Sequence, residues 1–340
     1  MNSTEIIEYN NLWIKAKKKA IDNIDKCFYP GCEEKSIKSH ILQRNGILSP
    51  LIEDGHLYQM EINLYKEPIN YFVRTGAGEA FSFNCFCNIH DNQLFKPIET
   101  HPIDFSLYRN RLLFLVRAKL NEKFRKMVVI DIWSQLIDFY KRKGDHYIVN
   151  DLMAKKLNGQ QGLSDILMSE QVIWNDLDSG SESFVIEFRE IEFLPICLAS
   201  FFDHETTDEI NRYRELQGKD MEKLSSIFIT VFPYNKKSII MLAYRQSDEK
   251  ILKGYVNKYL KESEKKLQRL ITNLMLFQCE TWVMSEDFFL KRIHKCQDFF
   301  HLAAKFSYQN NNERRNFDLN MFREGFCEKT KTWENLYTNY

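Results

Sequence analysis

The chain has 340 residues, of which 44% are hydrophobic and 28% are charged, with only 12 glycines and 7 prolines. This composition excludes a disordered chain and is typical of a helix-rich globular protein, long enough for two or three domains with separate cores. Basic and acidic side chains both number 47, which excludes a uniformly basic surface and still permits a local basic stripe.

The N-terminal segment, residues 4–25, predicts an amphipathic helix because bulky apolar side chains recur at helical spacing. Lysines occupy the rest of its surface, and such a charge run is typically a solvated face. The expected apolar stripe consists of Ile7, Trp13 or Ile14, Ile21 and Ile24.

Two pairs of metal-binding residue types follow. Cys27 and Cys32 flank a Pro-Gly turn, which brings their sulfurs toward one point. Cys87 and His90 are three residues apart, so they share a face on the first turn of a helix. Four such ligands suit a tetrahedral structural zinc site.

Cys85 competes with His90 for the fourth ligand position. In an extended segment Cys85 and Cys87 point to opposite sides, so we rank Cys85 below His90. The alternative for the whole set is ordinary buried cysteines. Against it, Cys27 and Cys32 are surrounded by Pro, Gly, Glu and Lys, which is the composition of a loop.

Strands are predicted between the two ligand pairs. Residues 56–65 and 69–74 are rich in aromatic and branched side chains with partial alternation, which indicates two strands or a β-hairpin. The following Gly76 and Gly78 predict a turn, because the surrounding sequence lacks the context of a phosphate-binding loop.

These residues, taken in order, resemble a known family. Cys-x4-Cys, then His40, then a hairpin-rich insert, then Cys-x2-His followed by Asp91, is similar to the treble-clef ββα-metal module of HNH endonucleases over residues 27–99. The resemblance implies that His40 is the general base that activates water. It implies that Asp91, with Asn92 as a second candidate, holds a catalytic Mg²⁺ or Mn²⁺ against the scissile phosphate. It further implies nucleic acid as the partner, with DNA as the first expectation, and a role such as bacterial defence.

The next segment carries the most basic face of the chain. Residues 104–127 predict an amphipathic helix, and residues 128–141 predict a second helix before Gly144. If the zinc module handles nucleic acid, this face is where phosphate contacts are expected. A bundle helix with a solvated outer face is the alternative. The candidate phosphate-binding residues are Arg109, Arg111, Arg117 and Lys119.

The second half of the chain predicts a mixed domain. Residues 157–162 indicate a domain boundary and residues 176–182 a second loop, because Gly, Asn, Asp and Ser dominate there. A small antiparallel sheet follows, and from residue 249 the pattern returns to helix. The predicted strands are residues 183–202, 225–231 and 237–244.

The eight cysteines bear on the compartment. The chain lacks a secretory signal, so we expect a cytoplasmic protein whose thiols are reduced or bound to zinc. No stretch approaches the ~20 apolar residues of a membrane span, so no membrane partner is expected. His294, Cys296 and Cys327 do not form a metal-binding spacing and are interpreted as structural or surface residues.

The sequence therefore predicts a soluble α+β protein, with an N-terminal zinc-bound treble-clef module followed by a mixed helical domain containing a small antiparallel sheet. The expected function is an HNH-like, metal-dependent endonuclease that hydrolyses phosphodiester bonds. The alternative is a non-catalytic zinc scaffold or a nucleic-acid- or protein-binding component, because Ser39 stands where the nuclease pattern usually has Asp, and serine is a poorer ligand for a hard cation. The expected segments are residues 1–103 (zinc module with N-terminal helix), 104–157 (helical segment) and 158–340 (mixed domain ending in helices).

Overall fold

The computed structural model describes residues 3–60, 72–203, 225–300, 302–303 and 319–337, and the chain divides into two compact units. The mixture of helices with antiparallel sheets is confirmed. The unit bounds differ from the expected segments, because most of the insert between the two ligand pairs belongs to the second unit. Unit 1 consists of Met1–Ile41, Leu64–Glu67 and Ser82–Ser181, and unit 2 of Leu42–Asn63, Pro68–Phe81 and Glu182–Tyr340.

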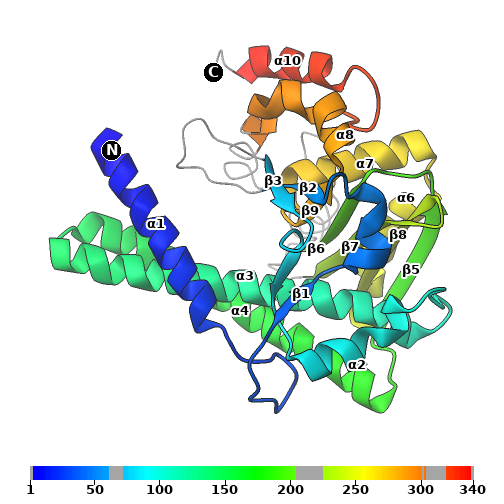
Figure 1. Cartoon of the computed structure of the whole chain (residues 1–340), viewed down its shortest axis with the longest axis horizontal. Helices are drawn as coiled ribbons and strands as arrows, with labels where there is room; N and C mark the ends of the chain where they lie inside the picture. The colour runs from blue at the N-terminus through cyan, green and yellow to red at the C-terminus, as the bar shows by residue number, and fades with distance from the viewer. Residues whose placement is uncertain (1–2, 61–71, 204–224, 301, 304–318, 338–340) are drawn as a thin grey trace. The chain divides into compact units, whose positions relative to one another are not determined.

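Three long helices form most of unit 1. α3 (Tyr108–Lys143) and α4 (His146–Ser179) are joined by a two-residue connection and pack along each other as an antiparallel pair. α1 (Ser3–Asn23) packs against α3 (Figure 1). Gly144 ends α3 in the left-handed region at φ 76°, and the Asp145 side chain caps α4 by accepting a hydrogen bond from the Ile148 N–H at 3.1 Å.

Two predictions made for these helices are wrong. The helices expected at residues 104–127 and 128–141 are one continuous helix, α3. The boundary expected at residues 157–162 lies inside α4. α4 continues through Gly159, and the absence of a side chain there leaves room for Trp133 of α3. A Cβ on Gly159 would lie 2.7 Å from the indole ring. This glycine serves close helix packing.

The buried stripe of α1 also differs from the prediction. Ile7 and Ile14 are 61% and 57% exposed, whereas Ala16 and Ala20 are buried. Small side chains let α1 approach α3 closely enough for the Gln135 side-chain amide to donate to the Ala16 carbonyl at 3.3 Å. Of the predicted stripe, Ile24 is buried and Trp13 and Ile21 are half-buried. The prediction is therefore wrong for Ile7 and Ile14, and it missed Ala16 and Ala20.

A short strand pair and a helix complete unit 1. β1 (Lys38–His40) pairs antiparallel with β4 (Ser82–Asn84), and α2 (Asn88–Glu99) follows β4 directly in sequence. Ser39 faces Phe83 across the pair, both are buried, and Phe83 contacts Phe124 of α3. This face of the strand pair is therefore the one that packs against α3.

Unit 2 is built on one seven-stranded sheet in the order β3-β2-β9-β6-β7-β8-β5, with antiparallel pairing throughout. The sheet is larger than expected, because the predicted hairpin between the ligand pairs, β2 and β3, joins it through β9. The predicted strand at residues 183–202 is two strands, β5 and β6. The strands are β2 (His56–Met60), β3 (Phe72–Gly76), β5 (Phe184–Ile191), β6 (Ile196–Asp203), β7 (Ser226–Tyr234), β8 (Lys237–Arg245) and β9 (Trp282–Met284).

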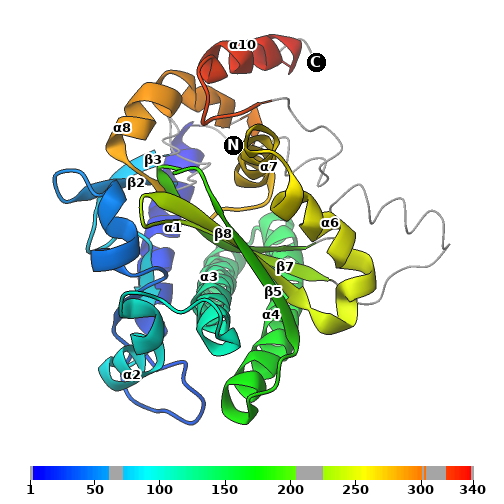
Figure 2. The ribbon, with the colours of Figure 1, turned by 90° about the vertical axis from the view of Figure 1, so that its right-hand side faces the viewer.

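Helices pack beside this sheet and bury its apolar side chains. α6 (Glu249–Lys261) contacts β5 and β8 (Figure 2), and Leu252 and Val256 share a core with Ile240 and Leu242 of β8. The other helical elements are α7 (Glu264–Phe277), α8 (Glu286–Phe288), α10 (Phe326–Tyr337) and the short turns η1 (Arg44–Leu48), η2 (Ser49–Leu51), η4 (Gln246–Asp248), η5 (Phe289–Ile293) and η6 (His294–Cys296).

One disulfide links η6 to α10, between Cys296 and Cys327. The expectation that all eight cysteines are reduced or on metal is therefore wrong for these two. Within the described parts of the chain, no helix has both the length and the apolar content needed to cross a membrane.

Candidate metal centre

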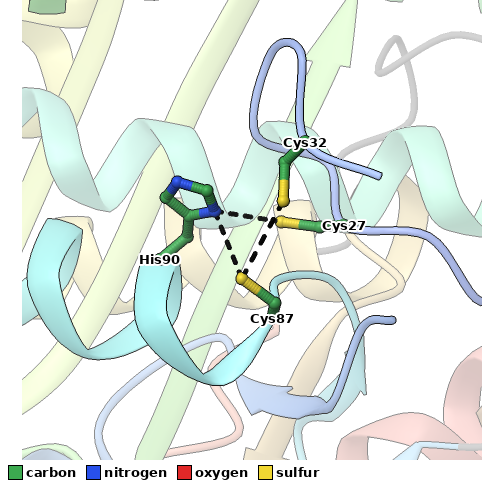
Figure 3. A group of neighbouring side chains, drawn as sticks. All are labelled: Cys27, Cys32, Cys87 and His90. Atoms are coloured by element: carbon green, nitrogen blue, oxygen red, sulfur yellow. Dashed lines mark hydrogen bonds between the residues drawn. The ribbon is translucent and has the colours of Figure 1, made fainter. Parts of the chain in front are cut away.

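Four side chains that lie far apart in the sequence converge in unit 1. Cys27, Cys32, Cys87 and His90 place one ligand atom each within 4.8 Å of all the others (Figure 3). Among the described residues this is the only group of three or more Cys, His, Asp or Glu side chains arranged in this way. These are the four predicted zinc ligands.

The distances within the group match tetrahedral coordination. Zinc bonds of about 2.3 Å to sulfur and about 2.0–2.1 Å to nitrogen require S···S edges of about 3.8 Å and S···N edges of about 3.5 Å. The Cys32 and Cys87 sulfurs are 4.0 Å apart. The His90 Nδ1 lies 3.5 Å from the Cys27 sulfur and 3.2 Å from the Cys87 sulfur. Three of the six ligand-atom distances are therefore close to tetrahedral edges, and all six are within 4.8 Å.

The first ligand pair is positioned by its own turn. The Cys27 N–H donates to the Glu34 carbonyl at 2.9 Å, and the Cys32 N–H donates to the Tyr29 carbonyl at 3.1 Å. Gly31 takes φ 75°, the left-handed conformation that glycine adopts readily. The Tyr29 N–H points at the Cys27 sulfur at 3.5 Å. These local hydrogen bonds fix the conformation of the turn that places the two sulfurs in the site.

The second pair sits at the start of α2. Cys87 is in extended conformation immediately before the helix, and its carbonyl accepts the first helical hydrogen bond, from the Asp91 N–H at 3.0 Å. Hydrogen bonding from the backbone of His90 lowers the pKa of the Cys87 thiol. The helix start therefore presents both a sulfur and an imidazole nitrogen to the site.

Cys27 behaves differently in the metal-free state. Burial raises the pKa of its thiol to about 11. At neutral pH the Cys27 proton therefore stays on sulfur, and binding of a cation at this group would release it.

Cys85 does not belong to the group. Burial raises the pKa of its thiol well above the usual range. Its backbone has a structural role instead: the Cys85 carbonyl accepts from the Phe28 N–H at 2.8 Å, and the Cys85 N–H donates to the Ile37 carbonyl at 3.3 Å. Cys85 thus helps to hold the Cys27 loop against β1.

An aromatic stack supports the imidazole ligand. The Tyr29 ring lies flat on the His90 ring, with centroids 3.9 Å apart and an interplanar angle of 6°. Trp174 of α4 meets Tyr29 edge-on at 5.5 Å. Sequence reasoning missed both residues. The position of Tyr29 between Cys27 and Cys32 was a usable signal, whereas nothing in the local sequence around Trp174 indicates its role.

Asp91, the expected ligand of a catalytic cation, is engaged by Arg117 of α3. The guanidinium of Arg117 is 2% exposed, and it lies 3.2 Å from the Asp91 carboxylate and 2.6 Å from the Glu99 carboxylate. It also stacks over the Phe95 ring at 3.8 Å. The Asp91 carboxylate is thus already paired with a buried guanidinium, which it shares with Glu99.

The other expected catalytic residues lie in different surroundings. His40 ends β1, and strand alternation places it on the face opposite Ser39, away from the face that packs on α3. The Asn92 side-chain amide donates to the Asn88 carbonyl at 2.7 Å. Asp91 pairs with Arg117 of α3.

The candidate phosphate contacts are only partly accessible. Arg117 and Lys119 are buried, because α3 is surrounded on all sides over residues 112–121. Arg109 is exposed and donates to the Leu177 carbonyl at 2.7 Å, and Arg111 is half-buried. The basic residues of this helix therefore do not form one outer face.

Comparison of the chain with family models, with curated proteins and with solved structures found no match in any of the three.

Proposed function

We propose that unit 1 binds one Zn²⁺ through Cys27, Cys32, Cys87 and His90, and that this centre is structural. Three thiolate donors and one imidazole favour zinc over hard cations such as Mg²⁺, which prefer oxygen ligands. A closed set of four protein ligands leaves no position for substrate. The observation that carries the proposal is the agreement of the three ligand-atom distances with tetrahedral edges.

The path of the chain explains why unit 1 needs such a centre. Unit 1 is discontinuous: Met1–Ile41 is separated from Ser82–Ser181 by residues that belong mainly to unit 2. Cys27 and Cys32 come from the first segment, and Cys87 and His90 from the second. The ion, when bound, supplies a cross-link between the segments. Closing loops of this length without a cross-link is entropically unfavourable.

The surroundings of the centre favour a non-catalytic scaffold. Asp91 is paired with Arg117, and Ser39, in place of an acid, is buried against α3. His40 lies on the other face of the strand pair. We therefore propose that the zinc module holds the helices of unit 1 in place for binding or assembly.

A metal-dependent nuclease is the second candidate, and the order of elements supports it. β1, β4 and α2 follow one another as two antiparallel strands and a helix, with His40 at the end of the first strand and Asp91 in the first helical turn. This order resembles that of a treble-clef, HNH-type module. In this candidate His40 would take a proton from water, and Asp91, released from Arg117, would hold a divalent cation whose charge would stabilise the phosphate.

The zinc proposal is tested by metal content. Purified wild-type protein, dialysed against a weak chelator, should retain one zinc per chain by mass spectrometry of the metal. Cys87→Ser should retain less than a tenth of that amount. Cys85→Ala is the matched control, because Cys85 is a buried cysteine two residues away and outside the ligand group, and it should keep full zinc. A zinc-free wild-type protein that remains folded would overturn the proposal.

The two functions are separated by a cleavage assay. Wild type and His40→Ala, both verified as folded and zinc-loaded, are incubated with plasmid and single-stranded DNA in Mg²⁺ or Mn²⁺. The scaffold proposal predicts no cleavage above background for either protein. Metal-dependent cleavage by wild type that disappears in His40→Ala would reject the scaffold and establish the nuclease.

A further inference from the structure

The disulfide between Cys296 and Cys327 holds the C-terminal helix α10 against η6. The Cα atoms of the two cysteines are 5.3 Å apart, within the range that a disulfide spans, and they are separated by 31 residues in the sequence. The sequence predicted only that both are structural or surface residues. We propose that this bond is a reversible thiol–disulfide switch that controls how often α10 opens, with a low-molecular-weight thiol as the exchange partner.

The site accommodates the reduced state as well as the oxidised one. The Arg292 carbonyl oxygen lies 3.5 Å from the Cys296 sulfur and 3.1 Å from the Cys327 sulfur. Once the disulfide is opened, both S–H groups have this carbonyl as an acceptor. After reduction, both thiols therefore keep a hydrogen-bond acceptor nearby.

Apolar packing keeps α10 close when the bond is open. Phe326 and Thr330 of α10 are buried, and the Phe326 ring meets Phe299 edge-on at 6.4 Å and Phe300 at 6.3 Å. The two sulfurs consequently remain near each other after reduction, which favours reformation of the bond. What the disulfide adds is a limit on how often the helix opens.

The two sulfurs differ in exposure, which sets the direction of exchange. Cys327 is half-buried and Cys296 is buried. The thiolate of a small thiol attacks the Cys327 sulfur, the S–S bond breaks, and Cys296 leaves as a thiolate that takes up a proton. A second small thiol attacks the mixed disulfide and releases Cys327. The protein disulfide gains two electrons, and two small thiols become one small disulfide.

The other cysteines of the chain do not offer an alternative site for thiol exchange. Cys85, Cys197 and Cys279 are buried and take no part in a disulfide. The three cysteines of the metal centre form their own group with His90. Thiol exchange at moderate concentrations of a small thiol is therefore expected to be confined to Cys296 and Cys327, and this inference does not rest on the proposed function.

The first measurement is the redox state of the full-length, zinc-loaded protein in buffers of reduced and oxidised glutathione, read by differential alkylation and peptide mass spectrometry. We expect Cys296 and Cys327 to be protected from alkylation in oxidising buffer and both labelled in reducing buffer, with recovery of the bond on reoxidation. Two freely alkylated thiols in oxidising buffer, or a bond that resists reduction, would overturn the proposal.

The second measurement is hydrogen exchange of the α10 amides. In the chain-entropy description, a closed loop of 31 residues lowers the population of the opened state by up to roughly 500-fold. Reduction should therefore lower the protection of the α10 amides by up to that factor. The doubly substituted Cys296→Ser, Cys327→Ser protein should exchange like reduced wild type in both buffers, and Cys279→Ala should respond like wild type. Unchanged protection of α10 on reduction of wild type would reject the fastening role.

Discussion

The buried guanidinium of Arg117 connects the helix that carries His90 to the longest helix of unit 1. Its hydrogen bonds reach the Asp91 and Glu99 carboxylates, which lie eight residues apart on α2, and its flat face covers Phe95. An arginine suits this position because its planar fork can serve two carboxylates and stack at the same time. The residue that looked like a phosphate ligand is therefore a link between helices.

Replacing Arg117 with methionine should lower the free energy of unfolding by about 2–3 kcal/mol. Breaking a fully buried pair typically costs about 3–5 kcal/mol, but the Asp91 and Glu99 side chains keep 20% and 27% exposure and can be partly hydrated. Urea unfolding measures the change. Arg125→Met, which removes the more exposed i,i+3 pair with Glu122, should cost at most about 1 kcal/mol. Equal effects of the two substitutions would argue against the linking role.

At the scale of elements, the β7–β8 hairpin depends on its turn. Asn235 and Lys236 both have positive φ, 49° and 63°, as a two-residue hairpin turn of type I′ requires. Asparagine tolerates this conformation, whereas lysine is strained in it.

Lys236→Gly should therefore stabilise the protein by about 0.5–1 kcal/mol, because glycine adopts positive φ without steric strain. The thermal midpoint should rise accordingly. Lys237→Gly provides the contrast: Lys237 begins β8 and pairs with Glu190 at 2.8 Å, so its loss should lower the midpoint. If Lys236→Gly lowers the thermal midpoint, the lysine side chain stabilises the protein by more than its strained backbone destabilises it.

Strand β8 also carries a group that makes stability depend on alkaline pH. Tyr244 is 1% exposed, and burial, with a smaller contribution from the Glu187 and Glu249 carboxylates, raises its pKa to about 12 from the usual 10. The folded state thus retains the phenol proton that the unfolded chain loses. This stability is fully present below pH 10 and is lost as pH rises from 10 to 12.

Between pH 8 and pH 11 the free energy of unfolding of wild type should fall by about 1.4 kcal/mol more than that of Tyr244→Phe, because one pKa unit corresponds to about 1.4 kcal/mol. Urea midpoints of the two proteins at pH 8 and pH 11 give the comparison. Phenylalanine fills nearly the same volume, so the difference between pH values isolates the hydroxyl. Parallel losses in both proteins would mean that Tyr244 does not titrate as its burial implies.

At the scale of the whole molecule, the two cross-links act on different units. The proposed zinc centre joins two chain segments of unit 1, whereas the Cys296–Cys327 disulfide lies entirely in unit 2. The two should therefore respond to different reagents.

Hydrogen exchange across the chain tests this separation. A strong chelator should reduce protection in β1, β4 and α2, whose arrangement depends on the ligand pairs, and should leave β6, β7 and β8 protected. A small thiol with zinc present should affect α10 and leave α2 unchanged. Loss of protection in both units on chelation alone would show that they unfold as one cooperative body.

Local sequence sufficed for the features whose causes are local. The Pro-Gly turn between Cys27 and Cys32, and the three-residue spacing of Cys87 and His90, each position two ligands through short-range geometry, so the metal group followed from the sequence. Strands β7 and β8 were predicted for the same reason, because their apolar pattern is a property of adjacent residues.

Contacts between distant segments were decided only by the tertiary structure. The sequence around Gly159 is typical of a domain boundary, but in the structure Trp133 packs against this glycine. Arg117 has the sequence pattern of a surface charge, but it is buried and paired with two carboxylates of α2. Strands β2 and β3 joined the main sheet, and Cys296 met Cys327, across long separations in the chain. Periodicity and spacing report how a segment folds on itself, whereas burial and pairing depend on which other segment packs against it, and that information is absent from any short stretch of sequence.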